Sequence, residues 1–470
     1  MNFIIKNATI INEGAIKVSS LYIKNGIIEA IDDWTNLKPL TENKEQLNLF
    51  DATTNNTEQI EVIDASGMWL LPGVIDTHVH FREPGLTEKA DFRTESSAAV
   101  AGGVTSIIDM PNTKPQTTDM QQLEDKLKIA SDKCIINYGL MLGATNDNID
   151  DILKADPSKF AAIKLFLGSS TGNMLVNETS KLDHLFKESK KLIVAHCEDE
   201  VVVQTNLANA KAEFEGTVNE TAALHPKIRT TEACYLSTYH AIERARKYGT
   251  HLHIAHLTTA TELNLLSNQS MDQKHITAEV TPNHLWFDDR DYEELGNKIK
   301  CNPAIKSNDD RLALWAGLYD GLIDTIATDH APHTLESKEL PYFKAPSGIP
   351  SIQHSLTMML EPCIVSNMEE DGNNTLLPMI IEKMCHAPAQ LFHIEKRGYI
   401  RKGYWADLTL VEPGALQTIE KSNLLYKCGW SPLEGQKFHS IVRKTWVNGV
   451  LVWDGKVINT HAGVALKYEQ

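Results

Sequence analysis

Residues 73–85, GVIDTHVHFREPG, run from an apolar segment into two histidines, an arginine and a Pro-Gly turn. Alternating side chains are typical of a β-strand, in which residues two apart project to the same side. His78 and His80 therefore point together where the strand ends, and two converging imidazoles can hold one metal ion. The competing interpretation is a pair of hydrogen-bonded structural histidines.

Seven later segments have the same form, apolar at the start and polar at the end, with stretches of helical character between them. They occupy residues 105–112, 135–143, 161–168, 191–198, 251–258, 275–282 and 324–331. The third of these eight segments, residues 135–143, fits the pattern least well. Eight β-then-α units predict a (β/α)8 TIM-type barrel, an α/β fold whose active site lies at the carboxyl ends of the strands.

The two ends of the chain have a different, β-rich character. Short strand-like segments occur at both ends, and Asn-Gly pairs at 25–26 and 448–449 are hairpin signals. Both ends together predict one small β-sandwich module. We expect residues 1–70 and 396–470 to form this module and residues 71–395 to form the barrel. The polar stretch 36–59 reads as a surface insertion.

Composition and charge narrow the class of protein. The chain has 470 residues, of which 42% are apolar and 23% charged, as is usual for a globular protein. Its net charge of −17 argues against binding to nucleic acid or to an anionic membrane, since both require a basic surface. Seven dispersed cysteines, without a CxxC pair or a secretory leader, predict a cytoplasmic protein with unpaired thiols.

The polar residues at the strand ends are of the types that bind a divalent cation. After the two histidines they comprise Asp109, Asn112, Lys164, His196, His256, Glu279 and Asp329. A closed barrel would bring them around one mouth, where zinc is the expected ion. Each has a structural alternative: Asp109 could cap a turn, and of His253 and His256 only one is expected to face the site.

Lys164 is unusual because apolar residues flank it on both sides, and burying a free ammonium is costly. The side chain could reach the barrel rim, or it could pair with Glu198 or Asp329. A third interpretation is carboxylation of the amine by CO₂, which gives a carbamate able to bridge two metals. The sequence leaves these three interpretations open.

Asp329 and Arg82 carry the remaining chemistry. A carboxylate beside a metal site can act as ligand and as general base, although a structural Asp that caps the loop is the alternative. Arg82, two residues beyond His80, suits a substrate carboxylate, and a rim ion pair is its alternative. Asn112 and His333 could add donors to that carboxylate.

Taken together, these segments resemble the dihydroorotases of the amidohydrolase superfamily, over nearly the whole chain. The likeness rests on residues 73–85, 109–115 (DMPNTKP), 162–173 (AIKLFLGSSTGN), 195–199 (AHCED), 254–259 (IAHLTT), 278–285 (AEVTPNHL), 327–338 (ATDHAPHTLESK) and 403–413 (GYWADLTLVEP). The combination is specific, whereas the His-x-His pair alone marks only the superfamily.

The resemblance implies a site with two Zn²⁺ ions per subunit, bridged by N6-carboxylated Lys164 and a hydroxide. His78, His80 and Asp329 would hold one ion, and His196 and His256 the other, while Glu279 would lie beside the ligands. Arg82, Asn112 and His333 would bind the substrate carboxylate. Thr171, on a mobile loop, and Asn302 would also contact the substrate.

The implied reaction is the reversible cyclisation of N-carbamoyl-L-aspartate to (S)-dihydroorotate with loss of water, a step of pyrimidine (UMP) synthesis, with Asp329 as the general base. The expected binding partner is therefore a small-molecule substrate. Because relatives are commonly dimers, the resemblance also allows a homodimer. Allantoinase and dihydropyrimidinase are the nearest rivals, but those relatives generally lack an arginine at position 82. An inactive scaffold for a carbamoyltransferase would have lost metal ligands, and here every expected ligand is present.

The chain departs from the family pattern at three places. Residues 302–306 read NPAIK where NPPLR is frequent, Asn283–His284 replaces two histidines, and Gln353 replaces a frequent Glu. These departures touch the expected substrate contacts and not the metal ligands.

Overall fold

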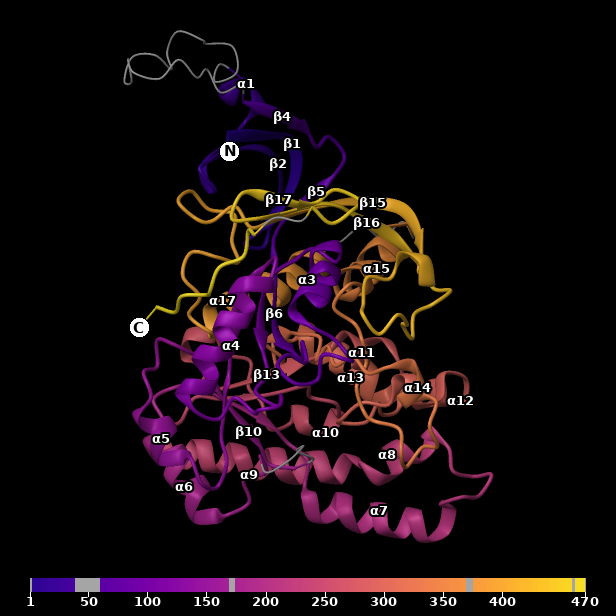
Figure 1. Cartoon of the computed structure of the whole chain (residues 1–470). Coiled ribbons are helices and arrows are strands. Elements are labelled where there is room, and N and C mark those ends of the chain that lie inside the picture. Colours follow the sequence, from indigo (N-terminus) through magenta and orange to yellow (C-terminus); the bar gives the residue numbers. More distant parts are fainter. Residues whose placement is uncertain (1, 39–59, 169–173, 369–374, 459–460, 470) are drawn as a thin grey trace.

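The computed structural model describes residues 2–38, 60–168, 174–368, 375–458 and 461–469. Figure 1 shows a barrel in the lower part of the molecule and a sheet module above it, to which both ends of the chain contribute. Most of the polar stretch 36–59 lies outside the described residues. Among the described helices none is long and apolar enough to cross a membrane.

The barrel strands are parallel and follow one another around the ring. They are β6 (Val74–Val79), β7 (Val104–Asp109), β8 (Asn137–Leu140), β9 (Leu142–Gly143), β10 (Ile163–Phe166), β11 (Ile193–His196), β12 (Leu252–Ile254), β13 (Ile276–Val280) and β14 (Thr325–Ile326). The third predicted segment is divided at Met141 into β8 and β9. Two arcs result, β6-β7-β8 and β9 to β14.

Main-chain hydrogen bonds join the two arcs. The amide of Ala161, which precedes β10, donates to the carbonyl of Leu140 at 2.8 Å. On the other side, the amide of His80 donates to the carbonyl of His330 at 2.8 Å, beside a parallel bridge between Val79 and His330. The predicted (β/α)8 fold class is therefore confirmed.

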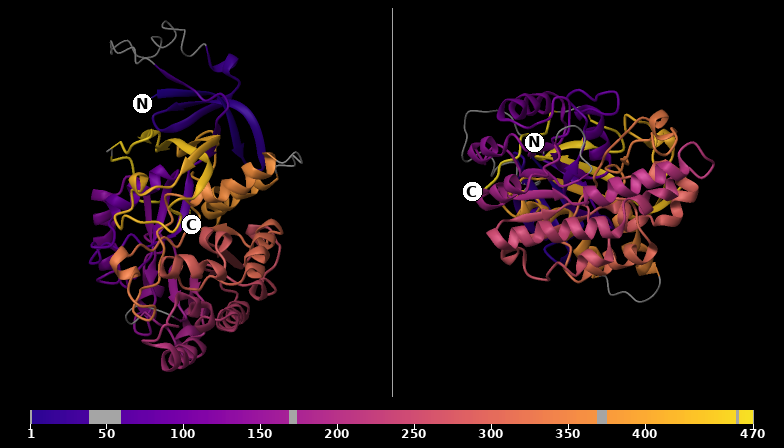
Figure 2. Two further views of the ribbon diagram at one scale, coloured as in Figure 1. Left: turned by 90° about the vertical axis from the view of Figure 1, so that its right-hand side faces the viewer. Right: turned by 90° about the horizontal axis from the view of Figure 1, so that it is seen from below.

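Helices cover the outside of the ring (Figure 2). The longer ones are α3 (Phe92–Ala101), α4 (Met120–Lys133), α6 (Thr179–Glu188), α7 (Glu200–Phe214), α9 (Thr231–Tyr248), α13 (Asn308–Tyr319) and α15 (Ser355–Met368). Shorter ones are α1 (Trp34–Leu37), α5 (Ile149–Lys154), α8 (His225–Ile228), α10 (Ala260–Leu263), α11 (Pro282–Trp286), α12 (Tyr292–Leu295), α14 (Leu335–Lys338), α16 (Leu376–Ile381) and α17 (Ala387–Leu391).

Several helices begin where a side chain replaces a missing main-chain partner. Asp91, Asp119 and Asp199 accept hydrogen bonds from the first-turn amides of α3, α4 and α7, and Thr230 does the same for α9. Such caps satisfy amides that have no partner within the helix. At its other end, α9 stops at Gly249, whose left-handed backbone favours glycine.

The terminal module is one eight-stranded sheet in the order β17-β16-β15-β5-β1-β2-β3, with β4 paired to β1. Its strands are β1 (Asn2–Asn12), β2 (Ala15–Lys24), β3 (Ile27–Asp32), β4 (Glu61–Asp64), β5 (Trp69–Pro72), β15 (Leu408–Thr418), β16 (Lys437–Val447) and β17 (Val450–Trp453). The central strand β5 pairs with β1 on one side and with β15 on the other. It therefore joins the two ends of the chain immediately before β6.

Both predicted Asn-Gly hairpins are present and they touch each other. Asn25–Gly26 and Asn448–Gly449 all have positive φ angles. A Cβ atom on Gly26 would lie 2.5 Å from the carbonyl oxygen of Asn448, and one on Gly449 would lie 2.5 Å from the Cα of Gly26. Glycine is therefore required at both turns by conformation and by space.

The end of the described chain packs against the barrel. Leu466 donates its amide to the carbonyl of Tyr138 in β8 at 2.8 Å, and its side chain joins a core cluster with Ile75, Ile108 and Val194 from three barrel strands. Apolar contacts from the tail thus supplement the packing inside the ring.

Candidate active site

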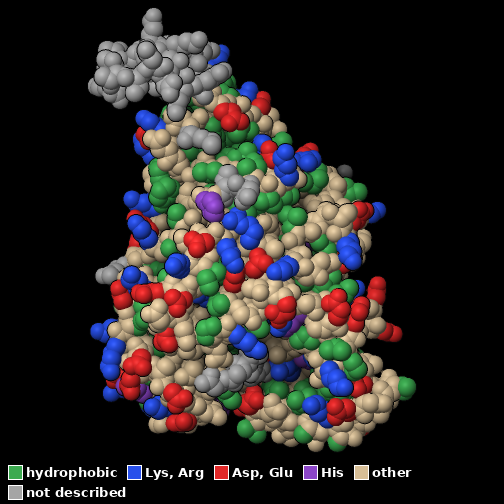
Figure 3. Space-filling model, in the orientation of Figure 1, with side chains coloured by type: hydrophobic (Ala, Val, Ile, Leu, Met, Phe, Trp, Pro, Cys, Tyr) green, Lys and Arg blue, Asp and Glu red, His purple; other side chains and the backbone are tan. Residues whose placement is uncertain are grey.

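A cavity of about 800 Å³ lies at the carboxyl ends of the barrel strands. It is lined by nearly all of the predicted site residues: His78, His80, Arg82, Asn112, Lys164, His196, His256, Asn302, Asp329 and His333. On the face seen in Figure 3 the surface is hollowed over the barrel, and histidine and basic side chains are visible inside. Closure of the ring therefore gathers residues that are up to 255 positions apart in the sequence, from 78 to 333.

His78, His256 and Asp329 form the tightest group. Each offers one ligand atom, and these atoms lie within 4.8 Å of one another. Asp329 Oδ1 is 3.0 Å from His80 Nε2 and 3.4 Å from His78 Nε2. His196 extends the group, because its Nδ1 is 3.0 Å from His256 Nε2.

Three of the four histidines have an oxygen partner on the nitrogen that faces away from the cluster, whereas Nδ1 of His256 is buried without a partner among the described residues. His78 Nδ1 is 2.7 Å from Glu279 Oε1, His80 Nδ1 is 2.8 Å from Asn112 Oδ1, and His196 Nε2 is 2.9 Å from Glu198 Oε2. Such a contact fixes the ring and places the proton on the outward nitrogen, so that the inward nitrogen keeps its lone pair. This arrangement is typical of histidines that ligate a metal.

The pKa values are consistent with neutral imidazoles around an ionised carboxylate. Burial lowers the pKa of His80 to about 4 and lowers those of His196 and His256 as well. Burial acts to raise the pKa of Asp329, but His78 and His80 outweigh it and hold that pKa below its usual range. Neutral imidazoles beside a carboxylate are the donor set that a divalent cation takes.

Lys164 is buried without a hydrogen-bond partner. The residue is 1% exposed, and its Nζ atom contacts no acceptor among the described residues. Two sequence-based alternatives are therefore wrong: the side chain does not reach the rim, and it forms no ion pair with Glu198 or Asp329. Burial lowers the pKa of Lys164 to about 8, which makes the neutral amine accessible near neutral pH.

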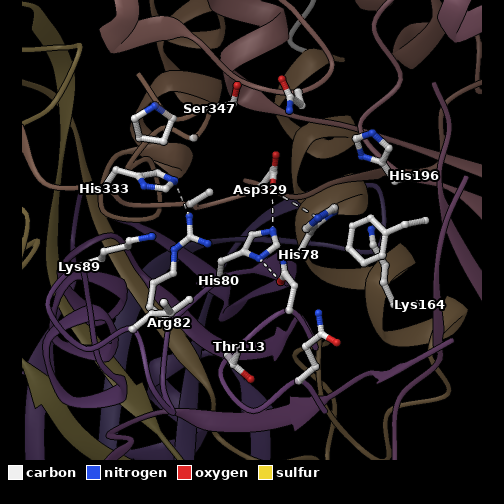
Figure 4. A pocket seen from close by; sticks show the side chains of 18 of the residues that line it. His78, His80, Arg82, Lys89, Thr113, Lys164, His196, Asp329, His333 and Ser347 are labelled. Atoms are coloured by element: carbon white, nitrogen blue, oxygen red, sulfur yellow. Dashed lines mark hydrogen bonds and ion pairs between the residues drawn. The ribbon is translucent and has the colours of Figure 1, made fainter. Parts of the chain in front are cut away.

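A basic end of the cavity faces this cluster. Figure 4 shows Arg82, Lys89 and His333 on one side of the cavity, and Lys164 and His196 on the other. Arg82 donates from Nη2 to His333 Nε2 at 3.1 Å and from Nε to the carbonyl of Pro332 at 3.1 Å. Although buried, its guanidinium has no carboxylate partner within 4 Å among the described residues. This is an environment that favours an anionic ligand.

Three of the site residues have an unusual backbone conformation that directs their side chains. Arg82, His256 and Asp329 have φ angles of 66°, 38° and 47°, a region that non-glycine residues seldom adopt. Such conformations cost about 1–3 kcal/mol each and cluster at functional sites. The direction of these side chains is therefore imposed by the strand ends that carry them.

Other predicted residues are placed as follows. Asn302 lines the cavity, and its Oδ1 is buried without a partner in the part of the chain that the structure describes. Thr171 lies outside the described residues. Glu279 lies behind His78, as expected. His253 contacts Thr277, and of the two histidines only His256 lines the cavity.

Asp109 is not part of the cluster. It accepts from the amide of Phe81 at 2.7 Å and pairs with the buried Lys126. The sequence reasoning missed Lys89, Ser347 and Gly348, which line the cavity, and the partner role of Glu198. For Glu198 a signal existed, since it follows His196 by two positions in the same apolar-to-polar segment.

Comparison with known proteins agrees with this geometry. Residues 69–452 match the model of the Amidohydrolase family. The chain belongs to the amidohydrolase family. It is 30% identical to a dihydroorotase of Methanosphaera stadtmanae, with 93% of both chains covered. The resemblance to the dihydroorotases is thereby confirmed.

Relatives with other names are also similar. An allantoinase of Salmonella paratyphi B is 26% identical over 96% of this chain and 95% of its own. The solved structure of an L-hydantoinase (dihydropyrimidinase) from Arthrobacter aurescens is 25% identical, with a TM-score of 0.87 over 99% of this chain and all of the other. Together these relatives support a hydrolase of cyclic amides. The site's histidine and aspartate cluster fits the metal dependence typical of the family.

The contact between Glu279 and His78 gives a testable expectation for metal binding. Glu279→Gln replaces the carboxylate that orients His78, and loss of such a partner weakens metal affinity about 10–100-fold. We expect faster metal loss to a chelator, measured by competition and by metal analysis. Glu262→Gln is the matched control, because Glu262 is equally buried but contacts Thr238 and Thr259. Equal metal retention in the two variants would contradict the role of Glu279.

Proposed function

We propose that this chain is a dihydroorotase, which interconverts N-carbamoyl-L-aspartate and (S)-dihydroorotate in pyrimidine synthesis. The observation that carries the proposal is the buried Arg82 at the basic end of the cavity, without a carboxylate partner among the described residues. Dihydroorotate bears a carboxylate for this guanidinium, whereas allantoin and dihydrouracil bear none. The identity to proteins named dihydroorotase supports the same choice.

Three residues would bind the substrate carboxylate. Arg82 offers a planar fork of donors, which suits two carboxylate oxygens. His80 occupies Oδ1 of Asn112, so the amide nitrogen of Asn112 remains able to donate. His333 accepts from Arg82 at Nε2 and thereby orients the fork. Asn302 and the loop that contains Thr171 are proposed to contact the ring.

We propose two zinc ions in the cluster. His78, His80 and Asp329 would hold one, His196 and His256 the other, and Lys164 would span both as a carbamate. The unpartnered amine of Lys164 beside these donors supports this assignment. When bound, the ions would polarise the amide carbonyl and acidify the attacking water.

Asp329 would move the proton. Its carboxylate faces the cavity and its low pKa keeps it ionised. In hydrolysis, it takes a proton from the attacking water and delivers it to the departing ring nitrogen. In cyclisation, it receives the proton of the ureido nitrogen as that nitrogen bonds to the side-chain carboxyl carbon, and it passes this proton to the carboxyl oxygen that departs when the C–O bond breaks. Arg82 holds the substrate so that these atoms meet.

The state of the cysteines bears on the compartment in which the enzyme works. All seven cysteines are unpaired, six of them buried, which fits a reducing compartment, and we propose that the enzyme works in the cytoplasm. A scaffolding role without catalysis is disfavoured, because all of the proposed ligands line one cavity.

The substrate is tested by assaying dihydroorotate, allantoin and dihydrouracil side by side, with metal analysis of the same sample. We expect turnover of dihydroorotate to dominate. Arg82→Ala should lower kcat/KM for dihydroorotate about a hundredfold, since a charge-assisted contact is lost, while metal content is retained. Arg246→Ala, an exposed arginine on α9, is the control. Preferred turnover of a neutral substrate would refute the assignment.

The proton-transfer role is tested with Asp329→Asn. The amide cannot accept a proton, so kcat should fall about 10²–10⁴-fold, as is usual when a general base is removed. At least one metal should remain bound. A rate close to that of the unmodified enzyme would remove Asp329 as the base.

The bridge is tested with Lys164→Ala. We expect lower metal content and partial rescue of both metal content and activity by acetate or propionate, whose carboxylate can replace the carbamate. Lys191→Ala is a suitable control, because burial also lowers the pKa of Lys191 to about 8 but that lysine lies outside the cavity. Full metal content in Lys164→Ala would exclude the carbamate.

A further inference from the structure

One wall of the cavity is held by two buried ammonium groups that the mechanism above does not use. Residues 346–348 form this wall beside His333 and Arg82, and Figure 4 shows Ser347 on that side of the cavity. Lys338, the last residue of α14, is 2% exposed. Lys300, before the loop that carries Asn302, is 7% exposed.

Lys338 binds three carbonyl oxygens. Its Nζ donates to Lys300 at 3.1 Å, to Pro346 at 3.0 Å and to Gly348 at 2.9 Å. An ammonium has three N–H donors and no acceptor, so these three carbonyls satisfy it completely. None of the ion pairs among the described residues involves Lys338. Carbonyl dipoles of the wall and of Lys300, rather than a carboxylate, therefore stabilise this ammonium.

Lys300 binds the segment that leads into this wall. Its Nζ donates to the carbonyls of Tyr342 at 2.7 Å and of Ala345 at 2.6 Å, and its own carbonyl accepts from the amide of Gly348 at 2.8 Å. The two ammonium groups thus tie residues 342–348 to the loop after residue 299. Neither end of the wall can shift without breaking charge-assisted bonds.

The wall packs directly on the residues proposed to bind the substrate carboxylate. A Cβ atom on Gly348 would lie 2.9 Å from His333 Cδ2 and 2.3 Å from the carbonyl oxygen of Ala331, so the main chain touches the imidazole. His333 in turn accepts from Arg82. Its carbonyl also accepts from Trp430 Nε1 at 2.8 Å, and Lys338 Nζ lies 5.9 Å over the Trp430 ring.

We propose that Lys338, assisted by Lys300, is a positioning residue for substrate binding: it sets the wall that fixes His333 and thereby the fork of Arg82. This role rests on the proposed use of Arg82 and His333 for the substrate carboxylate. It predicts an effect on substrate binding rather than on metal binding, because the wall contacts described above are with Ala331, His333 and the two lysines and not with the proposed metal ligands.

The test compares Lys338→Met and Lys300→Met with Lys344→Met, which removes an exposed lysine from the same loop. Hydrogen–deuterium exchange of residues 339–350, metal content and steady-state kinetics are measured for each. In the first two variants we expect faster exchange in this segment and a KM for dihydroorotate raised about tenfold to a hundredfold, as a misplaced binding group produces. Metal content should be unchanged and kcat should fall much less than KM rises. Lys344→Met should match the unmodified enzyme.

Three outcomes would overturn the proposal: unchanged exchange in both variants, an unchanged KM despite faster exchange, or a loss of kcat that parallels metal loss. If Lys338→Met is insoluble, soluble Lys300→Met carries the same expectations, and an unchanged KM in it is equally decisive. The exchange measurement separates this proposal from the proposed function. If the unmodified enzyme does not turn over dihydroorotate, the dihydroorotase assignment fails. Unchanged exchange in both variants would separately show that the lysines do not hold the wall.

Discussion

The site depends on closure of the strand ring between β14 and β6. One main-chain hydrogen bond, from the amide of His80 to the carbonyl of His330, joins segments 250 residues apart. It brings Asp329 within 3.0 Å of His80 and 3.4 Å of His78. A carboxylate and two imidazoles therefore meet because the first and last strands are neighbours.

Burial then decides what these groups can do. In water, the imidazoles would be partly protonated near neutral pH and the lysine would be charged. Inside the barrel, desolvation lowers the pKa of His80 to about 4 and that of Lys164 to about 8. Outward hydrogen bonds to Glu279, Asn112 and Glu198 fix the rings, so that lone pairs face the cavity. The same protein interior therefore favours the neutral form of both the imidazoles and the amine.

Much of this could be predicted from the sequence, because the barrel repeats one simple pattern. The change from apolar to polar at each strand end identified His78, His196, His256 and Asp329, and the hairpins followed from two Asn-Gly pairs. Segment 135–143 fitted the pattern least well, but the position of its division at Met141 had no signal, since Leu140 and Leu142 beside it are equally apolar.

The burial of Lys164 without an ion pair could not be predicted, because exposure and ion pairing depend on neighbours that only the fold supplies. The wall at residues 346–348 was missed for a related reason. Lys338 lies within the recognised segment 327–338, but its partners are main-chain carbonyls, and any residue type carries a carbonyl. A sequence pattern shows which side chains are present, but it does not indicate which of them bind main-chain carbonyls.

The cavity thus has two ends that are built by different means. The cluster around Asp329 is set by strand ends, where the ring geometry allows little variation. The end around Arg82 is set by loops, which buried lysines tie together and which can change without disturbing the ring. Proteins named dihydroorotase, allantoinase and hydantoinase all resemble this chain over most of its length. Strand ends thus fix the cluster while loops hold the wall separately, so the wall can change in sequence while the cluster is kept.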